Sequence, residues 1–145
     1  MIVLDTNVLS ALMRSESDAA VVEWLDNLPA VSFWTTSITV LEVRTGLELL
    51  VTSRRRRILE AAFEQLLFED LGGRILSFDT AAAEIAGRLV ARRQQEGKSI
   101  EIRDAQIAGI TLARKATLAT GNIRHFKDLG LRLVDPWNRS VSRKQ

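Results

Sequence analysis

Short runs of apolar, β-prone residues alternate along the chain with longer segments whose apolar residues recur at helical spacing. The short runs predict strands at residues 2–4, 31–34, 74–78, 117–120 and 131–134. The longer segments predict helices at residues 6–13, 17–28, 35–51, 53–67, 79–96 and 102–115. Strands that alternate with helices are typical of an α/β fold, with a central, mostly parallel sheet flanked by helices on both faces.

Polar residues stand where two of the predicted strands end, which is where open α/β sheets bind their ligands. Asp5 follows the first strand, and Thr120, Gly121 and Asn122 follow the fourth. Glu42 and Asp104 lie in the early turns of two predicted helices. We therefore take Asp5, Glu42 and Asp104 as candidate site carboxylates.

Each of these carboxylates also has a purely structural interpretation. On a helical wheel, Glu42 falls beside Ile38 and Leu49, where a carboxylate is costly unless a buried Arg or a metal pairs with it. Asp104 can simply stabilise the first turn of its helix through the dipole. Asp5 can cap the turn after its strand. None of the three residues is decisive alone.

Composition narrows the chemistry that the chain can perform. The 145 residues contain no cysteine and one histidine, which argues against thiolate and multi-histidine metal sites. Carboxylate oxygens then remain as ligands, and they suit Mg²⁺ or Mn²⁺. The length suits one domain, expected at residues 1–137 before a polar tail at 138–145. Neither a leader nor a membrane-spanning run is evident, so we expect a cytoplasmic protein.

Four segments in order along the chain resemble the motifs of PIN-domain nucleases, and most of all the VapC/FitB-like toxins of bacterial toxin–antitoxin pairs. The segments are 1–7 (MIVLDTN), 36–46 (TSITVLEVRTG), 102–108 (IRDAQIA) and 118–126 (LATGNIRHF). The resemblance extends from Met1 to about Trp137. It implies a PIN-like three-layer sandwich and a metal-dependent ribonuclease that forms a homodimer.

The resemblance also implies roles for particular residues. Asp5, Glu42 and Asp104 match the family's catalytic and metal-binding carboxylates, and Asn7 and Thr120 match polar supports of that site. The family often has a fourth acidic residue where this chain has Asn122, a weaker cation ligand, so the number of metal ions stays open. Mg²⁺ is the expected cofactor, with Mn²⁺ as the alternative.

The partners implied by the resemblance are an RNA substrate and a cognate antitoxin that occupies the active-site groove. The toxin and antitoxin would assemble into a hetero-oligomer that contacts operator DNA through the antitoxin only. The run Arg54, Arg55, Arg56 and Arg57 is either a solvated helix face, with Arg56 and Arg57 paired to Glu60, or a contact for RNA or antitoxin.

Two other enzyme classes fit this sequence poorly. A haloacid-dehalogenase-type phosphatase needs an acidic residue at the position of Asn7. A phospho-receiver domain needs paired acidic residues after the first strand, where this chain has Thr6 after Asp5. A catalytically inactive module that binds RNA or a partner is the main alternative. His125 is expected to be a loop residue rather than a general base. The three scattered tryptophans are expected to serve packing rather than base stacking.

Overall fold

The computed structural model describes residues 1–14 and 16–138, so most of the predicted polar tail at 138–145 lies outside the described residues. A five-stranded sheet runs through the centre of the molecule, with the order β3-β2-β1-β4-β5 and parallel pairing throughout. Its strands are β1 (Ile2–Leu4), β2 (Phe33–Thr36), β3 (Ile75–Leu76), β4 (Thr117–Ala119) and β5 (Arg132–Val134). The predicted parallel sheet is confirmed.

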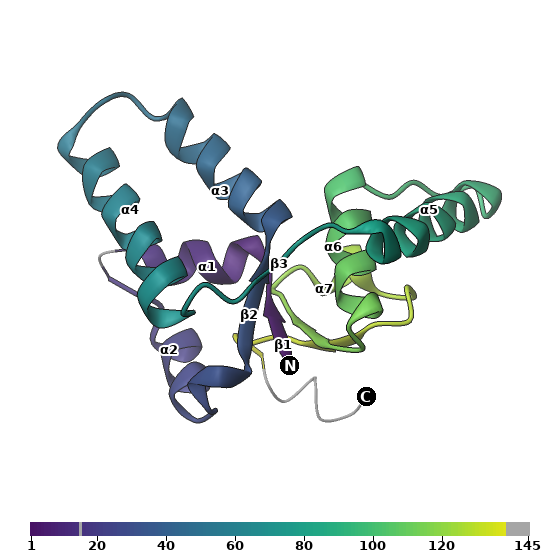
Figure 1. The fold of residues 1–145 in the computed structure, drawn as a ribbon, viewed down its shortest axis with the longest axis horizontal. Coiled ribbons are helices and arrows are strands. Elements are labelled where there is room, and N and C mark those ends of the chain that lie inside the picture. Colours follow the sequence, from purple (N-terminus) through teal and green to yellow (C-terminus); the bar gives the residue numbers. More distant parts are fainter. Residues whose placement is uncertain (15, 139–145) are drawn as a thin grey trace.

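Helices cover both faces of this sheet and form the outer layers of a three-layer sandwich (Figure 1). One face carries α1 (Thr6–Met13), α2 (Ala19–Asp26), α3 (Ser37–Leu49), α4 (Arg54–Glu64) and the π-helix η2 (Gln65–Asp70). The other face carries α5 (Thr80–Gln95), α6 (Ile102–Ala113) and α7 (Ile123–Phe126). Each face has its own apolar core, centred on Leu9 and Phe63 in one and on Ile107 and Leu118 in the other.

The helix starts follow the local capping chemistry of the sequence. Asp18, Thr36, Ser53 and Asp79 each accept a backbone N–H from the first turn of the helix that follows. The first helix is capped by Asp5, whose side chain accepts the Thr6 N–H. No helix within residues 1–14 and 16–138 combines the length and the apolar character needed to cross a membrane.

Several elements differ from the sequence prediction. The third strand, predicted at residues 74–78, is confined to Ile75–Leu76, and the helix predicted at 53–67 ends at Glu64, where the π-helix η2 begins. The second strand begins at Phe33 instead of residue 31, because Pro29 caps the short 3₁₀ helix η1 (Ala30–Ser32) and leaves Val31 73% exposed. The segment of α7 was predicted to be a turn and a loop. It is a single helical turn, too short for an apolar period to reveal it in the sequence.

The strand order creates one topological switch point, where the sheet brings β1 and β4 side by side. From β1 the chain adds β2 and β3 on one side, and β4 and β5 lie on the other. The register pairs Leu4 of β1 with Ala119 of β4, so the residues that follow both strands emerge together. A crevice at such a switch point is where open α/β sheets bind ligands.

Candidate active site

The Asp5 side chain is buried at the carboxyl end of β1, with 5% of the residue exposed. Its backbone N–H continues the sheet by donating to the Ala119 carbonyl at 3.0 Å. Three groups donate to its carboxylate: the Thr6 N–H at 2.8 Å, the Thr120 hydroxyl at 2.7 Å and the Asn7 side-chain amide at 3.1 Å. These contacts hold both carboxylate oxygens in a fixed orientation.

Burial raises the pKa of Asp5 above its usual range because water no longer solvates the charged form. Hydrogen bonds from Thr120, Thr6 and Asn7 oppose this shift, while the negative charge of Glu42 adds to it. The pKa nevertheless remains raised. A charged Asp5 therefore gains from any cation that approaches it.

Asn7 links the first turn of α1 to the loop after β4. Its amide nitrogen reaches the Thr120 hydroxyl at 3.3 Å as well as Asp5, and its oxygen accepts the Gly121 N–H at 2.9 Å. The Asn122 N–H in turn donates to the Thr120 hydroxyl oxygen at 3.0 Å. The structure thus brings the predicted supports Asn7, Thr120 and Asn122 into one network around Asp5.

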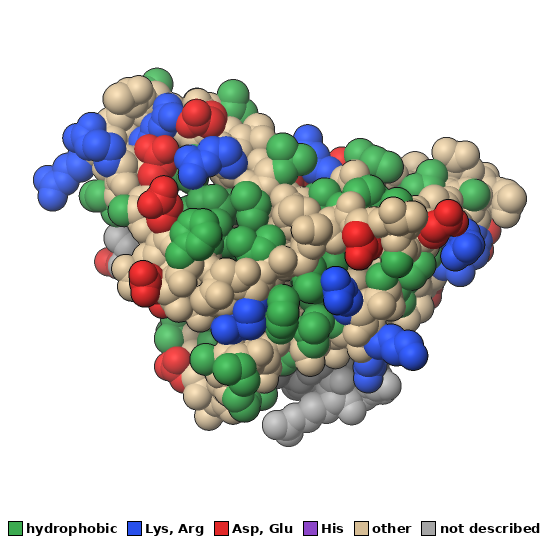
Figure 2. All heavy atoms as spheres, viewed as in Figure 1, with side chains coloured by type: hydrophobic (Ala, Val, Ile, Leu, Met, Phe, Trp, Pro, Cys, Tyr) green, Lys and Arg blue, Asp and Glu red, His purple; other side chains and the backbone are tan. Residues whose placement is uncertain are grey.

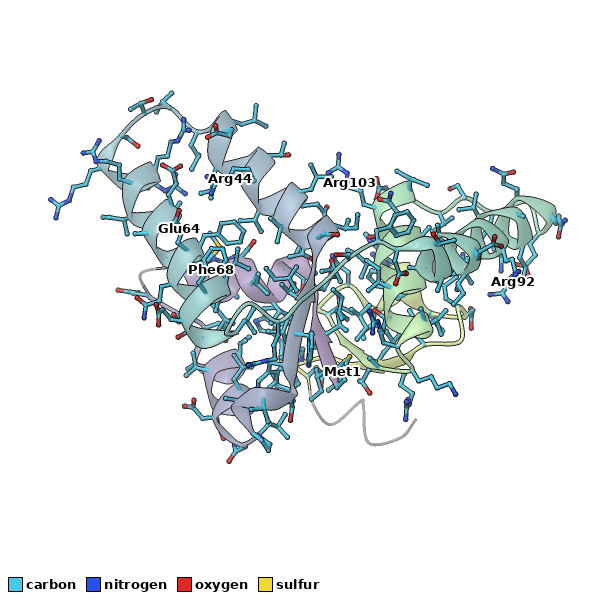
Figure 3. All side chains as sticks on the ribbon, in the orientation of Figure 1. Met1, Arg44, Glu64, Phe68, Arg92 and Arg103 are labelled. Carbon is cyan, nitrogen blue, oxygen red and sulfur yellow. The ribbon has the colours of Figure 1, made fainter. Side chains whose placement is uncertain are left out.

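Glu42 reaches the same site from the second turn of α3. The Thr6 hydroxyl donates to one of its carboxylate oxygens at 2.7 Å, and Arg103 lies 3.6 Å from the other. Arg103 stands at the start of α6, between α6 and α3 (Figure 3). The sequence left open a salt bridge with a buried Arg; the partner is an Arg, but its side chain is 46% exposed.

Asp104 completes the acidic group from the first turn of α6. Burial raises its pKa to about 6, and the negative charges of Asp5, Glu101 and Glu42 contribute to this shift against the opposing effect of His125. His125 Nδ1 lies 3.2 Å from the Asp104 carboxylate. His125 therefore contacts a candidate site residue from α7, where the sequence predicted only a loop position.

The three carboxylates come from different elements and lie close enough for their charges to act on one another. Their side chains do not converge on one point: across residues 1–14 and 16–138, no three Asp, Glu, His or Cys side chains are arranged to hold a metal ion. Arg103 instead lies beside Glu42, and His125 lies beside Asp104. The arrangement gathers negative charge around a buried, oriented aspartate.

Comparison with known proteins identifies the family of this chain. The family model for the PIN domain matches residues 2–130. The chain belongs to the PIN-domain family. The VapC ribonuclease Y4jK of Sinorhizobium fredii is 36% identical over 94% of this chain and 98% of its own length. The toxin FitB of Neisseria gonorrhoeae is 33% identical over 95% of this chain and 99% of its own.

A solved structure extends the comparison to three dimensions. One chain of FitAB bound to an IR36 DNA fragment superposes with a TM-score of 0.84 and is 34% identical to this chain. The alignment covers 94% of this chain and 96% of the other. This likeness confirms the PIN-like three-layer fold that the four sequence motifs predicted.

Sequence reasoning missed three side chains that contact the candidate carboxylates: Thr6, Arg103 and His125. Thr6 and Arg103 are neighbours of Asp5 and Asp104, inside the motifs that carry the family resemblance. Both polar side chains could have been nominated as local partners of carboxylates. The contact of His125 with Asp104 joins two separate helices, so no local signal indicates it.

The arginine run begins α4, at the end of the α3–α4 hairpin that lies away from the sheet (Figure 1), and basic side chains gather over that end of the molecule (Figure 2). Arg56 is structural: it pairs with Glu48 and, at 3.5 Å, with Glu60, and it donates to the Leu50 carbonyl at 3.1 Å. Glu60 takes its second arginine from α3, since Arg44 pairs with it at 3.2 Å. The predicted ion pair with Glu60 is thus confirmed for Arg56. The second arginine that pairs with Glu60 is Arg44, where the sequence predicted Arg57.

Arg54 and Arg55 have a different environment from Arg56. Together with Arg14, Glu16, Ile58 and Leu59 they line a surface pocket of about 580 Å³. Its lining therefore combines three arginines and one glutamate with two apolar side chains.

Proposed function

We propose that this chain is the toxin of a toxin–antitoxin pair, a divalent-metal-dependent ribonuclease that hydrolyses RNA phosphodiester bonds until a cognate antitoxin neutralises it. The observation that carries the proposal is the buried, hydrogen-bonded Asp5 at the switch point of the sheet, facing the charges of Glu42 and Asp104. The names of the ribonuclease Y4jK and the toxin FitB support the activity and the biological role. The retained carboxylates favour an enzyme over an inactive binding module.

Asp5, Glu42 and Asp104 would hold the metal once its charge draws together side chains that do not converge in this structure, with Mg²⁺ as the first candidate and Mn²⁺ as the second. Their oxygens are the donors that hard cations prefer, and their mutual repulsion is relieved by a divalent charge. A bound divalent ion supplies Lewis-acid polarisation of the phosphate and a water of lowered pKa. The neutral amide of Asn122 adds no charge to this set.

Neighbouring side chains orient the three carboxylates and partly compensate their negative charge. Thr120 and Asn7 fix the Asp5 carboxylate, and Thr6 fixes Glu42, so the acidic groups are positioned before substrate arrives. Arg103 and His125 counter the charge of the outer carboxylates. We expect the substrate phosphate to bind among side chains that hydrogen bonds already hold in place.

Purified protein should cleave RNA in Mg²⁺ and stop when a chelator is in excess. Expression of the chain alone should arrest growth, and co-expression of the antitoxin encoded with it should restore growth. Asp5→Asn is the matched control, because it preserves shape while removing a carboxylate that Thr120 and Asn7 orient. Binding of RNA without metal-dependent cleavage would support the inactive module instead.

Within this proposal, the antitoxin contacts the pocket lined by Arg54 and Arg55 in addition to the active-site groove. Its three arginines outnumber the one glutamate and, together with Ile58 and Leu59, suit an acidic, amphipathic peptide segment. The toxin–antitoxin assembly would then meet operator DNA through the antitoxin, in keeping with the DNA-bound FitAB structure.

Replacing Arg54 and Arg55 together by Gln should weaken antitoxin affinity about tenfold, because two desolvated guanidinium contacts are lost. The melting temperature and RNA cleavage should stay unchanged. Arg56→Gln is the matched variant: loss of its pairs with Glu48 and Glu60 should lower the free energy of unfolding by about 1 kcal/mol and leave affinity intact. Calorimetric titration with antitoxin and thermal melts measure both effects. The reverse pattern would assign the pocket no role in binding.

A homodimer is also part of this proposal. Leu41 on α3 and Ile102 on α6 are large apolar residues with 53% and 57% of their surfaces exposed. Ile102 also lines an apolar groove of about 400 Å³ between α5 and α6, beside Phe78 and Val90. A second copy of the chain would cover this surface.

A further inference from the structure

A small pocket opens beside the buried aspartate, on the side of the loop after β4. Its volume is about 250 Å³, and it is lined by Asn7, Gly121, Asn122, Asp135 and Trp137. Asn7 is the same residue that donates to the Asp5 carboxylate at 3.1 Å. Asn7 therefore links the pocket directly to the Asp5 carboxylate, on which the proposed chemistry depends.

Trp137 forms a wall of this pocket and is held there by three contacts. Its indole N–H donates to the Asp18 carboxylate at 2.7 Å, and its backbone N–H donates to Asp135 at 2.9 Å. The ring also packs against Gly121, where a Cβ would lie only 2.9 Å from ring atom Cζ3. Gly121 thus leaves room for an aromatic ring that remains 36% exposed.

The sequence predicts packing roles for all three tryptophans, and the Trp137 ring does pack against Gly121. Trp24 does serve packing, since it is 7% exposed and meets the Phe33 ring edge-on at 5.6 Å. Trp137 combines exposure, a fixed orientation and a place in the pocket wall. An aromatic ring with these properties is the usual platform for an unpaired base.

We propose that this pocket is a nucleobase subsite for the RNA substrate, in which the base of a nucleotide next to the scissile phosphate stacks on Trp137. The inference rests on the proposed ribonuclease activity and deepens it. Asn122 and Asp135 offer a side-chain amide and a carboxylate to the polar edge of the base. Asn122 then contributes to substrate recognition, at the position where a fourth acidic ligand was expected.

The dimensions of the pocket favour a base over a segment of the antitoxin. Pockets for drug-sized ligands span about 300–1,000 Å³, so 250 Å³ suits one small planar group. A peptide segment requires a longer surface, and the pocket with Arg54 and Arg55 provides one with complementary charge. A nucleotide whose phosphate lies at the carboxylates places its base within reach of Trp137, because Asn7 borders both places.

The test compares an intact RNA substrate and its two abasic versions on two proteins. After the cut site is mapped in a mixed-sequence RNA, an oligonucleotide carrying that site is compared with versions that are abasic on either side of it. For the wild-type protein, the abasic change at the stacked nucleotide should lower kcat/KM about 5- to 100-fold, mainly through KM. Trp137→Leu should lower kcat/KM for the intact RNA by a similar factor. For this variant, the abasic change should cause no further loss of kcat/KM.

Two further variants separate stacking from folding. Trp137→Phe keeps an aromatic face and should retain part of the discrimination between the two substrates. Trp34→Phe changes a tryptophan on β2 that does not line the pocket, and it should discriminate as the wild type does. A Trp137→Leu protein that slows both substrates equally would show a structural role and overturn the subsite. So would a Trp137→Leu protein that loses only antitoxin affinity.

A binding measurement keeps this inference separable from the proposed activity. Without metal, a short oligoadenylate should quench tryptophan fluorescence of the wild-type protein more than an abasic oligonucleotide of equal length does. Trp137→Leu should remove that difference. Absence of cleavage together with normal quenching would refute the proposed activity but support the subsite. Normal cleavage with no difference in quenching and no abasic effect would refute the subsite alone.

Discussion

Asp104→Asn should lower RNA cleavage more than a hundredfold, since loss of a mere outer-shell partner of a metal costs about 10–100-fold. Without metal, the same variant should melt at an unchanged or higher temperature. Asp104 is crowded by the charges of Asp5 and Glu42, and the neutral amide relieves that repulsion. The gain is expected to be about 1 kcal/mol at pH 7. Thermal melts and one RNA assay on the two proteins measure both effects.

The pH dependence of this difference follows from the raised pKa of Asp104. Burial raises that pKa from 3.8 to about 6, so between these values the folded protein holds a proton that the unfolded chain has lost. The resulting stabilisation is complete below about pH 4 and is lost as pH rises through 6. The stability of Asp104→Asn relative to the wild type should therefore increase across this window. Melts at pH 4 and pH 7 compare the two ends.

Added Mg²⁺ distinguishes a metal ligand from a helix-stabilising aspartate. A ligand that binds only the folded state raises its stability by mass action, so Mg²⁺ should raise the melting temperature of the wild type more than that of Asp104→Asn. An aspartate that only stabilises the first turn of α6 predicts that Mg²⁺ raises the melting temperature of both proteins equally. In that case Asp104→Asn would be less stable and almost fully active, and the site assignment would be wrong.

Gly109→Ala should produce the largest loss of stability among single methyl additions in this chain. Gly109 lies on α6 where α5 packs closest, and a Cβ there would sit 2.4 Å from the Ala82 carbonyl oxygen and 3.1 Å from the Ala86 Cβ. Backbone atoms cannot rotate away, so the two helices must separate. We expect the free energy of unfolding to fall by about 3 kcal/mol, which denaturant titration measures.

Gly46→Ala is the control for this substitution. Gly46 lies on an exposed part of α3, and no atom comes within 4 Å of the position that an alanine Cβ would take there. Alanine is the better helix former, so the free energy of unfolding should rise by about 0.5–1 kcal/mol. If both variants changed stability equally, helix propensity rather than the α5–α6 contact would explain the effect at Gly109.

Local rules explain why much of the architecture was predictable. Asp79 caps α5 as its position before an apolar period indicated, and the apolar strands β1 and β4 lie almost where the sequence placed them. These features depend on neighbours a few residues apart. The second strand starts later than predicted because Pro29 sets a 3₁₀ turn after it, a local competition that strand propensity alone does not resolve.

Part of the candidate site was predictable from the order of the strands. Parallel strands share one carboxyl edge, so the sequence alone was enough to expect Asp5 and Thr120 together. Their 2.7 Å hydrogen bond agrees with that expectation. The catalytic assignment of Asp5, Glu42 and Asp104 stays a prediction, which the Asp104→Asn experiment tests.

The sequence by itself determined the order of elements, the parallel α/β class and the candidate carboxylates, because periodicity, caps and motif spacing are properties of neighbouring residues. Only the tertiary structure decided which distant side chains meet: Arg103 with Glu42, His125 with Asp104, and the Trp137 ring with Gly121. These contacts depend on how α3, α6, α7 and the segment after β5 pack around the sheet. Packing is set by the whole chain at once, so no local pattern records it.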